Sequence, residues 1–340
     1  MTIPFGNRKI GDGEPVLVIA EIGINHEGNA ETCARMIEAA AAAGADSIKL
    51  QTIDADANYV RGTESHRLFS SCGLSREETA NMFRLTRDLG MEPFTTVGDL
   101  KSLEWIECLD PAGHKISSGL LTTHPIVARA AQTGRTLIIS TGLAEIADVE
   151  EAVAVARKSG PSPIALLQCT SLYPAPFDSL NLAAIRELAA RFSVVTGFSD
   201  HSLGVEAAPL AVAAGAKIIE KHFSLDATRS GYDHGISLEP DDFGDMVKRI
   251  RLAERMLGHR DKRLSPDEAA RAPVYHRVLV ALRPIVRGEA FDHTNLGFKR
   301  PLPGRLGLAP SHYDTVLGKT ASRALVADEP VNWSDIGDGA

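Results

Sequence analysis

Two histidines lie where two successive apolar segments of the sequence end. His201 follows residues 194–200, and His222 lies near the end of residues 217–223. Imidazole is a frequent metal ligand, and its charge changes near neutral pH. Two imidazoles on adjacent strand ends can share one metal, and together with oxygen ligands they suit Mn²⁺. A lone histidine is more often a hydrogen-bonded structural residue, so this interpretation needs support from other side chains.

Other polar side chains occupy the same kind of position. They fall near the ends of short β-rich segments from different parts of the chain. A turn or capping role accounts for any single one of them. So many from separate segments are difficult to explain by stability alone, whereas one shared site explains them together. These residues are Glu21, Lys49, Gln51, Thr96, Lys115, Ser118, Ser140, Ser199, His201 and His222.

The segments that must position these side chains follow a regular order. Between residues 16 and 257, short β-rich segments alternate with alanine-rich segments of helical period. We predict strands at residues 16–23, 47–52, 92–97, 114–118, 136–141, 164–169, 194–200 and 217–223. We predict helices at residues 30–43, 75–89, 145–158, 182–191, 204–214 and 241–256.

This alternation predicts an α/β fold, a closed parallel (β/α)8 TIM barrel whose strand ends meet at one mouth. Gly44, Gly90 and Gly215 follow predicted helices, where a left-handed glycine stops the helix. A doubly wound open sheet is the alternative. That fold would carry a glycine-rich phosphate loop after the first strand, and EIGINHEGNAE does not contain the GxGxxG pattern.

The alternation stops near residue 258. Residues 259–274 are polar and irregular, which predicts a linker between a barrel of residues 1–258 and a second domain. Residues 275–340 are rich in turns and prolines, with short β-like runs, which predicts a small β-rich domain. A domain of this size buries only a marginal core. We therefore expect it to pack on the barrel or on a partner chain.

The composition is that of an ordinary globular protein and excludes several classes. The net charge is −8 and no long lysine or arginine run occurs, so we expect no nucleic-acid partner. The four cysteines form no CxxC pair, which favours reduced thiols and a cytoplasmic location. The sequence shows no signal peptide and no apolar stretch of membrane-spanning length. An anionic ligand would need positive charge that is concentrated locally.

An ordered set of motifs resembles the sialic acid synthase family, whose members make nine-carbon 2-keto-3-deoxy sugar acids. The resemblance covers nearly the whole chain, and residues 275–340 resemble the family's antifreeze-like (SAF) domain. The motifs are IAEIGINHEG, IKLQT, HKISSG, STG, CTSLYPAP, GFSDHSLG, EKHF and DHGISLEP. The resemblance implies a TIM barrel that condenses phosphoenolpyruvate with an N-acetylated hexosamine in open-chain form. It also implies a divalent metal, Mn²⁺ or Mg²⁺, and a homodimer in which one subunit's SAF domain closes the partner's active site.

The same resemblance assigns roles to individual residues. It makes His201 and His222 the metal pair, with Glu21 nearby. With Glu21, Lys49 and Lys115 as the catalytic residues, Glu21 would orient or deprotonate a water molecule, and the lysines would offset negative charge. The implied phosphoenolpyruvate-binding residues are Lys49, Thr96, Lys115, Ser118, Ser140, Ser171 and Ser199. The implied sugar-binding residues are Gln51, Tyr173, Asp233 and, from the partner's SAF domain, Arg300.

The sequence departs from the family pattern on the sugar side. Leu120 follows HKISSG, where the family usually has an acid that touches the sugar, and the segment between Gln51 and Met91 is shorter than usual. The SAF loop reads PLPGRLGLAP in place of Gly-Gly-x-Gly-Ile. These departures leave N-acetylmannosamine and a 2,4-diacetamido sugar both open as acceptors. Two other functions also stay open: a pyruvate aldolase-type barrel and an inactive carbohydrate-binding homologue.

Overall fold

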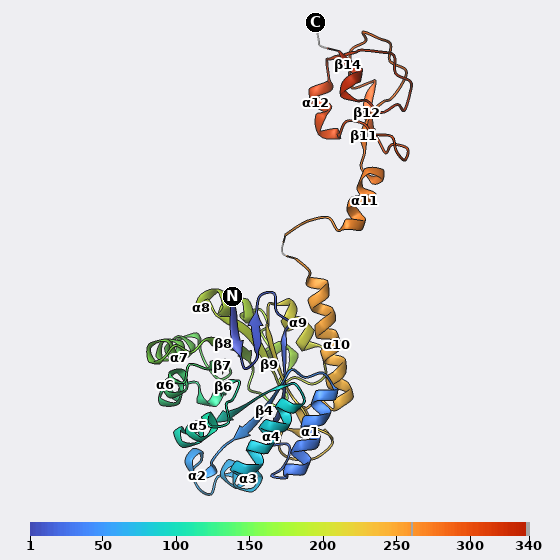
Figure 1. Cartoon of the computed structure of the whole chain (residues 1–340). Coiled ribbons are helices and arrows are strands. Elements are labelled where there is room, and N and C mark those ends of the chain that lie inside the picture. Colours follow the sequence, from blue (N-terminus) through green and yellow to red (C-terminus); the bar gives the residue numbers. More distant parts are fainter. Residues whose placement is uncertain (260, 338–340) are drawn as a thin grey trace. The chain divides into compact units, whose positions relative to one another are not determined.

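The computed structural model describes residues 1–259 and 261–337, and the chain divides into two compact units, Met1–Gly258 and His259–Ala340. Each unit has a hydrophobic core of its own. Figure 1 shows the order of their helices and strands along the chain. Of the helices in these described ranges, none has the length and apolar character needed to cross a membrane.

The first unit is the predicted TIM barrel. Its strands form a closed barrel in the order β10-β3-β4-β5-β6-β7-β8-β9, and all neighbours run parallel. Every strand predicted from the sequence is present at nearly the predicted bounds. The strands are β3 (Leu17–Gly23), β4 (Ser47–Thr52), β5 (Glu92–Val97), β6 (Gly113–Ile116), β7 (Thr136–Ser140), β8 (Ile164–Cys169), β9 (Val195–Asp200) and β10 (Ile218–His222).

Helices follow the strands, as the sequence predicts. Ser75 and Glu78 form a capping box at the start of α4, and Gly44 and Gly90 end the first two long helices with φ of 90° and 78°. Two helices, α5 and α6, were not predicted. The barrel helices are α1 (Ala30–Ala42), α4 (Arg76–Asp88), α5 (Leu100–Glu107), α6 (His124–Gln132), α7 (Ile146–Ser159), α8 (Ala184–Phe192), α9 (Ala207–Ala213) and α10 (Pro240–Leu257). Short helices α2 (Ala55–Asn58) and α3 (Glu64–Cys72) lie between β4 and α4.

An N-terminal hairpin, β1 (Thr2–Phe5) and β2 (Arg8–Gly11), closes the amino end of the barrel. Its Phe5 ring packs edge-on against Phe94, with 5.1 Å between centroids, within a core cluster of inward-facing strand residues. Gly113 is required there, since a Cβ at this position would lie 3.0 Å from the Phe5 ring and 2.6 Å from the Thr136 carbonyl oxygen. The barrel interior is therefore apolar at its amino end, which leaves the carboxyl end for polar side chains.

The second unit corrects the prediction for residues 259–274. Helix α11 (Pro266–Tyr275) occupies much of the segment that we expected to be an irregular linker, because Ser265 and Glu268 form a capping box at its start. The remainder is β-rich, as predicted. Its other elements are β11 (Val278–Ala281), β12 (Leu296–Lys299), α12 (Tyr313–Val316), β13 (Thr320–Ala321) and β14 (Ile336–Gly337).

The β-rich part of this unit is an internal duplication. Ile285 and Leu325 exchange backbone hydrogen bonds of 2.9 Å in both directions, so the two halves meet as equivalents. Each half then repeats the same ion pair, Arg283 with Glu289 at 2.7 Å and Arg323 with Glu329 at 2.9 Å. Each half also has the same backbone turn, in which Glu289 N–H donates to the Val286 carbonyl oxygen and Glu329 N–H donates to the Val326 carbonyl oxygen. The two halves share one hydrophobic core.

Candidate active site

A cavity of about 500 Å³ lies at the carboxyl ends of the barrel strands. Polar side chains from most strands of the barrel converge on it, as expected for this fold. Every site residue that the sequence predicts within the barrel lines it. These residues are Glu21, Lys49, Gln51, Thr96, Lys115, Ser118, Ser140, Ser171, Tyr173, Ser199, His201, His222 and Asp233. Arg300 belongs to the second unit, whose position relative to the barrel is not defined.

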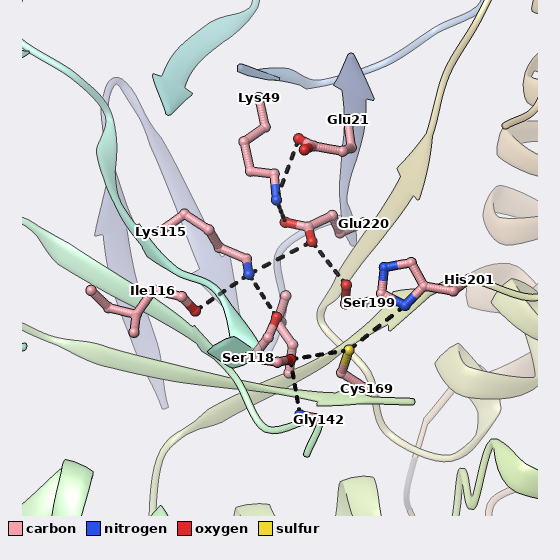
Figure 2. A network of polar contacts seen from close by, with 12 residues as sticks. Glu21, Lys49, Lys115, Ile116, Ser118, Gly142, Cys169, Ser199, His201 and Glu220 are labelled. Carbon is pink, nitrogen blue, oxygen red and sulfur yellow. Dashed lines mark hydrogen bonds and ion pairs between the residues drawn. The ribbon is translucent and has the colours of Figure 1, made fainter. Parts of the chain in front are cut away.

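Four ionisable side chains form a buried cluster at the floor of the cavity. The Nζ of Lys49 lies 3.3 Å from Glu21 and 3.0 Å from Glu220, and the Nζ of Lys115 lies 3.7 Å from Glu220. Figure 2 shows Glu220 between the two lysines. Lysine is rarely buried without a partner, and both lysines here are at least 95% buried. The cluster therefore places two lysine cations in one cavity of an acidic chain, with Glu220 as their shared counter-ion.

Hydroxyl groups hold this cluster in place. Ser199 Oγ donates to Glu220 Oε1 over 2.9 Å, and Lys115 Nζ donates to Ser140 Oγ over 2.6 Å. Ser118 and Ser171 reach the same cavity beside Gly142, where a Cβ would lie 2.7 Å and 2.3 Å from their Oγ atoms. Only glycine at this position leaves both hydroxyl groups room to point into the cavity.

The two carboxyl groups of the cluster differ in pKa. Burial raises the pKa of Glu21 to about 7, although Lys49 opposes the shift. Burial also favours neutral Glu220, but Lys115 and Lys49 outweigh it and lower the pKa of Glu220 to about 2. Glu220 is therefore a permanent counter-ion. Glu21 gains or loses its proton near neutral pH, which is the property that general acid–base catalysis requires.

The two lysines also differ in pKa. Burial lowers the pKa of Lys115 to about 8, although Glu220 opposes the shift. Burial by itself would lower the pKa of Lys49, but Glu21 and Glu220 together raise it above its ordinary value. At neutral pH both side chains are cations. An anion that enters the cavity thus meets two fixed positive charges.

The two histidines lie side by side at one wall of the cavity, with their ring centroids 5.3 Å apart. His201 Nδ1 lies 3.0 Å from the Thr170 carbonyl oxygen, which leaves its Nε2 free. His222 Nδ1 is buried without a hydrogen-bond partner, and it lies 3.6 Å from Asp233 Oδ2. Burial holds the pKa of His222 well below its usual range, so this imidazole is neutral. A neutral ring with an unpartnered nitrogen beside a carboxylate is suited to a divalent cation.

No group of three or more histidine, cysteine, aspartate or glutamate side chains in residues 1–259 and 261–337 has the spacing of a complete metal site. A cation at the two histidines would therefore take its remaining ligands from water or substrate. The pKa of His201 does not favour the neutral imidazole, which is the form that binds a metal. Burial lowers it, but Cys169 and the Thr170 carbonyl raise it above the ordinary value.

The sugar-side residues lie around the same wall. The Tyr173 ring lies against His201 at a tilt of 39°, with 4.4 Å between ring centroids, and Gln51 Nε2 donates to Glu21 Oε1 over 2.9 Å. Leu120, Leu143 and Ile53 supply an apolar part of the lining. The cavity thus has a charged floor and a partly apolar rim.

Comparison with known proteins agrees with this geometry. The sequence model of the NeuB family matches residues 36–262, which is more than half of the chain. The chain belongs to the NeuB family. The SAF domain model matches residues 276–337 of this NeuB chain. Both the family resemblance and the β-rich SAF domain predicted from the sequence are confirmed.

Relatives of this NeuB chain include synthases of nonulosonic acids. An N,N'-diacetyllegionaminic acid synthase of Legionella pneumophila is 32% identical over 354 residues, 97% of this chain and 99% of that protein. A pseudaminic acid synthase of Campylobacter jejuni is 32% identical over 335 residues, 94% of this chain and 96% of that protein. A solved structure of N-acetylneuraminic acid synthetase from Leptospira borgpetersenii, with citrate, has a TM-score of 0.77 at 33% identity, covering 80% of this chain and 95% of that chain.

Our interpretation of the NeuB sequence did not include Glu220. This residue lies between Ile219 and Lys221 in an apolar strand, which looked like packing. The missed signal is the period of two: Glu220 and His222 point to the same side of β10, whereas Lys221 points away from the barrel interior. There, fully buried Lys221 donates to Asp200 Oδ2 over 2.9 Å, and Asp200 accepts from Ser202. This ion pair between Lys221 and Asp200, outside the barrel interior, fixes the turn that carries His201.

Proposed function

We propose that this chain condenses phosphoenolpyruvate with an N-acylated hexosamine in open-chain form. The products are a nine-carbon 2-keto-3-deoxy sugar acid and phosphate. The observation that carries the proposal is the cluster of Lys49, Lys115 and Glu220 at the floor of a barrel cavity, beside two histidines. Phosphoenolpyruvate carries a carboxylate and a phosphate, and it needs this kind of fixed positive charge. The relatives, which are synthases of legionaminic and pseudaminic acids, support the same reaction class.

On the phosphoenolpyruvate side, Lys49 and Lys115 bind the anionic oxygens. Lys115 is oriented by Ser140 and Glu220, so its ammonium group requires little reorganisation when the substrate binds. Hydroxyl groups around the cavity would donate hydrogen bonds to the remaining oxygens, which for Ser199 requires its single proton to turn away from Glu220. We assign this role to Thr96, Ser118, Ser140, Ser171 and Ser199.

On the acceptor side, His201 and His222 would hold a divalent metal, Mn²⁺ or Mg²⁺. When bound, the metal would supply Lewis-acid polarisation of the sugar's aldehyde oxygen. The neutral state of His222 and its unpartnered Nδ1 support this assignment. Gln51, Tyr173 and Asp233 would orient the acceptor from the same wall of the cavity.

The reaction forms a bond between C3 of phosphoenolpyruvate and the aldehyde carbon. Water then adds at C2, and the bond from C2 to the phosphate oxygen breaks as the 2-keto group forms. One proton of this water ends on the former aldehyde oxygen, which becomes a hydroxyl group, and the other leaves with phosphate. Glu21 takes a proton of that water, because its pKa of about 7 makes it an effective base at neutral pH. Lys49 and Lys115 stabilise the negative charge of the departing phosphate.

A homodimer would complete the site, with Arg300 of the partner subunit reaching the N-acyl group of the sugar. Within its own unit, the Arg300 guanidinium lies 5.3 Å from the centroid of the Tyr275 ring. This stacking is typical of arginine and leaves the edge of the guanidinium open to an acceptor. The dimer and the cytoplasmic location stay predictions.

Phosphate release from phosphoenolpyruvate tests the proposal. The purified chain with Mn²⁺ is offered N-acetylmannosamine and a panel of 2,4-diacetamido hexoses, and we expect acceptor-dependent phosphate release with at least one of them. Absence of release with every acceptor contradicts the proposal. So does trapping of pyruvate on a lysine by borohydride, because a Schiff base belongs to a pyruvate aldolase. Sugar binding without turnover would indicate an inactive carbohydrate-binding protein.

Leu120 determines the polarity of the acceptor in this proposal. Its side chain lines the cavity beside Leu143, so we propose a 2,4-diacetamido sugar as the favoured acceptor. Leu120→Glu is expected to lower kcat/KM for the diacetamido sugar relative to N-acetylmannosamine by roughly 10- to 100-fold, since it buries a carboxylate against an apolar group. The ratio of the two kcat/KM values measures the effect. Leu210→Glu, an exposed leucine on α9, is the matched control. An unchanged ratio in Leu120→Glu would contradict this role.

A further inference from the structure

The loop that carries Asp233 is tied to one buried side chain of a neighbouring loop. Strands β10 and β3 are paired with His222 opposite Glu21, so the loops that follow them lie next to each other. Asn25, in the loop after β3, is 1% exposed. Its Oδ1 accepts from the backbone N–H of Asp233 over 3.0 Å. Its Nδ2 donates to the Phe223 carbonyl oxygen over 3.1 Å and to Ser237 Oγ over 2.9 Å.

These three bonds join both ends of the loop to its middle. Phe223 starts the loop, Ser237 ends it, and Asp233 lies between them. Ser237 Oγ also donates to the Asp233 carbonyl oxygen over 2.6 Å, so both backbone polar groups of Asp233 are fixed. An amide is the side chain that donates twice and accepts at the same time. Asn25 therefore uses both of its donors and one acceptor position on this one loop.

The loop needs to be held, because its backbone is unfavourable at Tyr232, the residue before Asp233. Tyr232 has φ of 50° and Gly231 has φ of 86°, so two successive residues adopt left-handed conformations. A tyrosine rarely adopts this conformation, and such strain persists only where surrounding contacts impose it. The bonds from Asn25 are contacts of this kind.

A second contact fixes the outer part of the same loop. His234 is buried, and its Nε2 lies 3.0 Å from Glu27 Oε1 while its Nδ1 lies 2.7 Å from Ser224 Oγ. Glu27 also pairs with Arg229 at 2.6 Å. The loop after β3 thus contacts the loop after β10 at two points, through Asn25 and through Glu27. Only the inner point, at Asn25, bonds directly to Asp233.

We propose that Asn25 is a positioning residue that holds the Asp233 carboxylate beside His222 on the acceptor wall. Asn25 does not line the cavity, so it acts through Asp233 and not on a substrate directly. It makes no bond to the cluster of Lys49, Lys115 and Glu220. Substitution of Asn25 should therefore weaken the binding of acceptor and cation and leave the binding of phosphoenolpyruvate unchanged. The assignment of Asp233 to the acceptor side rests on the proposed function.

Asn25→Ala tests this inference in the full chain. Because three hydrogen bonds are lost, we expect the KM for the acceptor sugar to rise about 30-fold, with the KM for phosphoenolpyruvate within about twofold of wild type. Binding of Mn²⁺ to the protein without substrates, measured by electron paramagnetic resonance, should weaken about tenfold. Hydrogen exchange at the Asp233 amide should lose its protection. Thr228→Ala is the matched control, because Thr228 is bonded to Asp226 in the exposed turn of the same loop.

The double variant separates positioning from general destabilisation. Asn25→Ala combined with Asp233→Ala should bind acceptor no more weakly than Asp233→Ala by itself, since Asn25 acts only through Asp233. Additive losses, or equal losses for phosphoenolpyruvate and acceptor, would overturn the inference. If Asn25→Ala does not fold, Ser237→Ala removes one anchor and should shift acceptor KM in the same direction by about fivefold. If wild type releases no phosphate, the proposed function fails, while Mn²⁺ binding and exchange at Asp233 still decide the role of Asn25.

Discussion

Lys115→Met is expected to lower kcat/KM for phosphoenolpyruvate about a thousandfold. The Lys115 ammonium is 1% exposed and held by Ser140 and Glu220, so it is an oriented charge that water cannot replace. Methionine has a similar length and fits an irregular space without a polar group. Glu220 keeps Lys49 and Ser199 as partners, so we expect the variant to remain folded.

Steady-state phosphate release and direct titration with phosphoenolpyruvate measure this effect. Lys101→Met is the matched control, because Lys101 is an exposed lysine on a separate, smaller cavity of the same barrel. It removes the same charge without touching the cluster. If Lys115→Met binds phosphoenolpyruvate with wild-type affinity, Lys115 does not contact this substrate and the assignment is wrong.

Glu21→Gln is expected to lower kcat by roughly 10²- to 10⁴-fold, which is the usual contribution of a general base. The sign of its pH dependence follows from the raised pKa of Glu21, about 7. A base acts when deprotonated, and Lys115 binds the substrate as a cation, so wild-type kcat/KM should rise with pH through about 7 and fall again above about 8. In Glu21→Gln this rising limb should disappear. A wild-type profile that falls through the same pH range would instead make Glu21 the proton donor.

The same raised pKa predicts that Glu21→Gln does not destabilise the barrel. The folded state holds the Glu21 proton up to a pH of about 7, above the ordinary value of 4.5. Its contribution to stability is therefore present at low pH and is lost as the pH rises through about 7. Neutral glutamine should retain that stability at higher pH. Urea unfolding at pH 6 and pH 8 measures this difference.

A carboxylate at the opposite end of the barrel serves as the control for Glu21→Gln. Glu92 is also buried, and its Oε1 accepts from the Asn7 backbone N–H over 2.9 Å. Glu92→Gln keeps that acceptor and lies far from the cavity lining. Its kcat and pH profile should match wild type. Full turnover in Glu21→Gln with an unchanged metal content would remove Glu21 from the proton-transfer role.

Local patterns predicted most of the barrel. The alternation of β-rich and helical segments, with glycines after the helices, is a property of neighbouring residues, and it placed all strands from β3 to β10. The hairpin β1–β2 was missed because its strands are too short for a period to show. Helix α11 was missed because its segment is polar, although the capping box at Ser265 is a local signal of a helix start. In both cases the local pattern could not be distinguished from that of a loop.

The candidate site was predictable where strand ends carry unusual residues. Lys49, Lys115, His201 and His222 are poorly suited to buried strands, so their positions pointed to a shared cavity, and the structure brings them together there. Glu220 was missed although its spacing of two from His222 places both on one side of β10, because no local pattern shows that two lysines would face it.

The sequence by itself determined which strand ends carry ionisable groups, since period and turn signals are read within one segment. Only the tertiary structure decided which of these groups meet. Glu220 lies between Lys49 and Lys115, and Asn25 bonds to Asp233, although the partners are far apart along the chain. The physical reason is that burial and ion pairing depend on distances across the closed barrel. Those distances give Glu21 and Glu220 different pKa values. No local sequence pattern contains these distances.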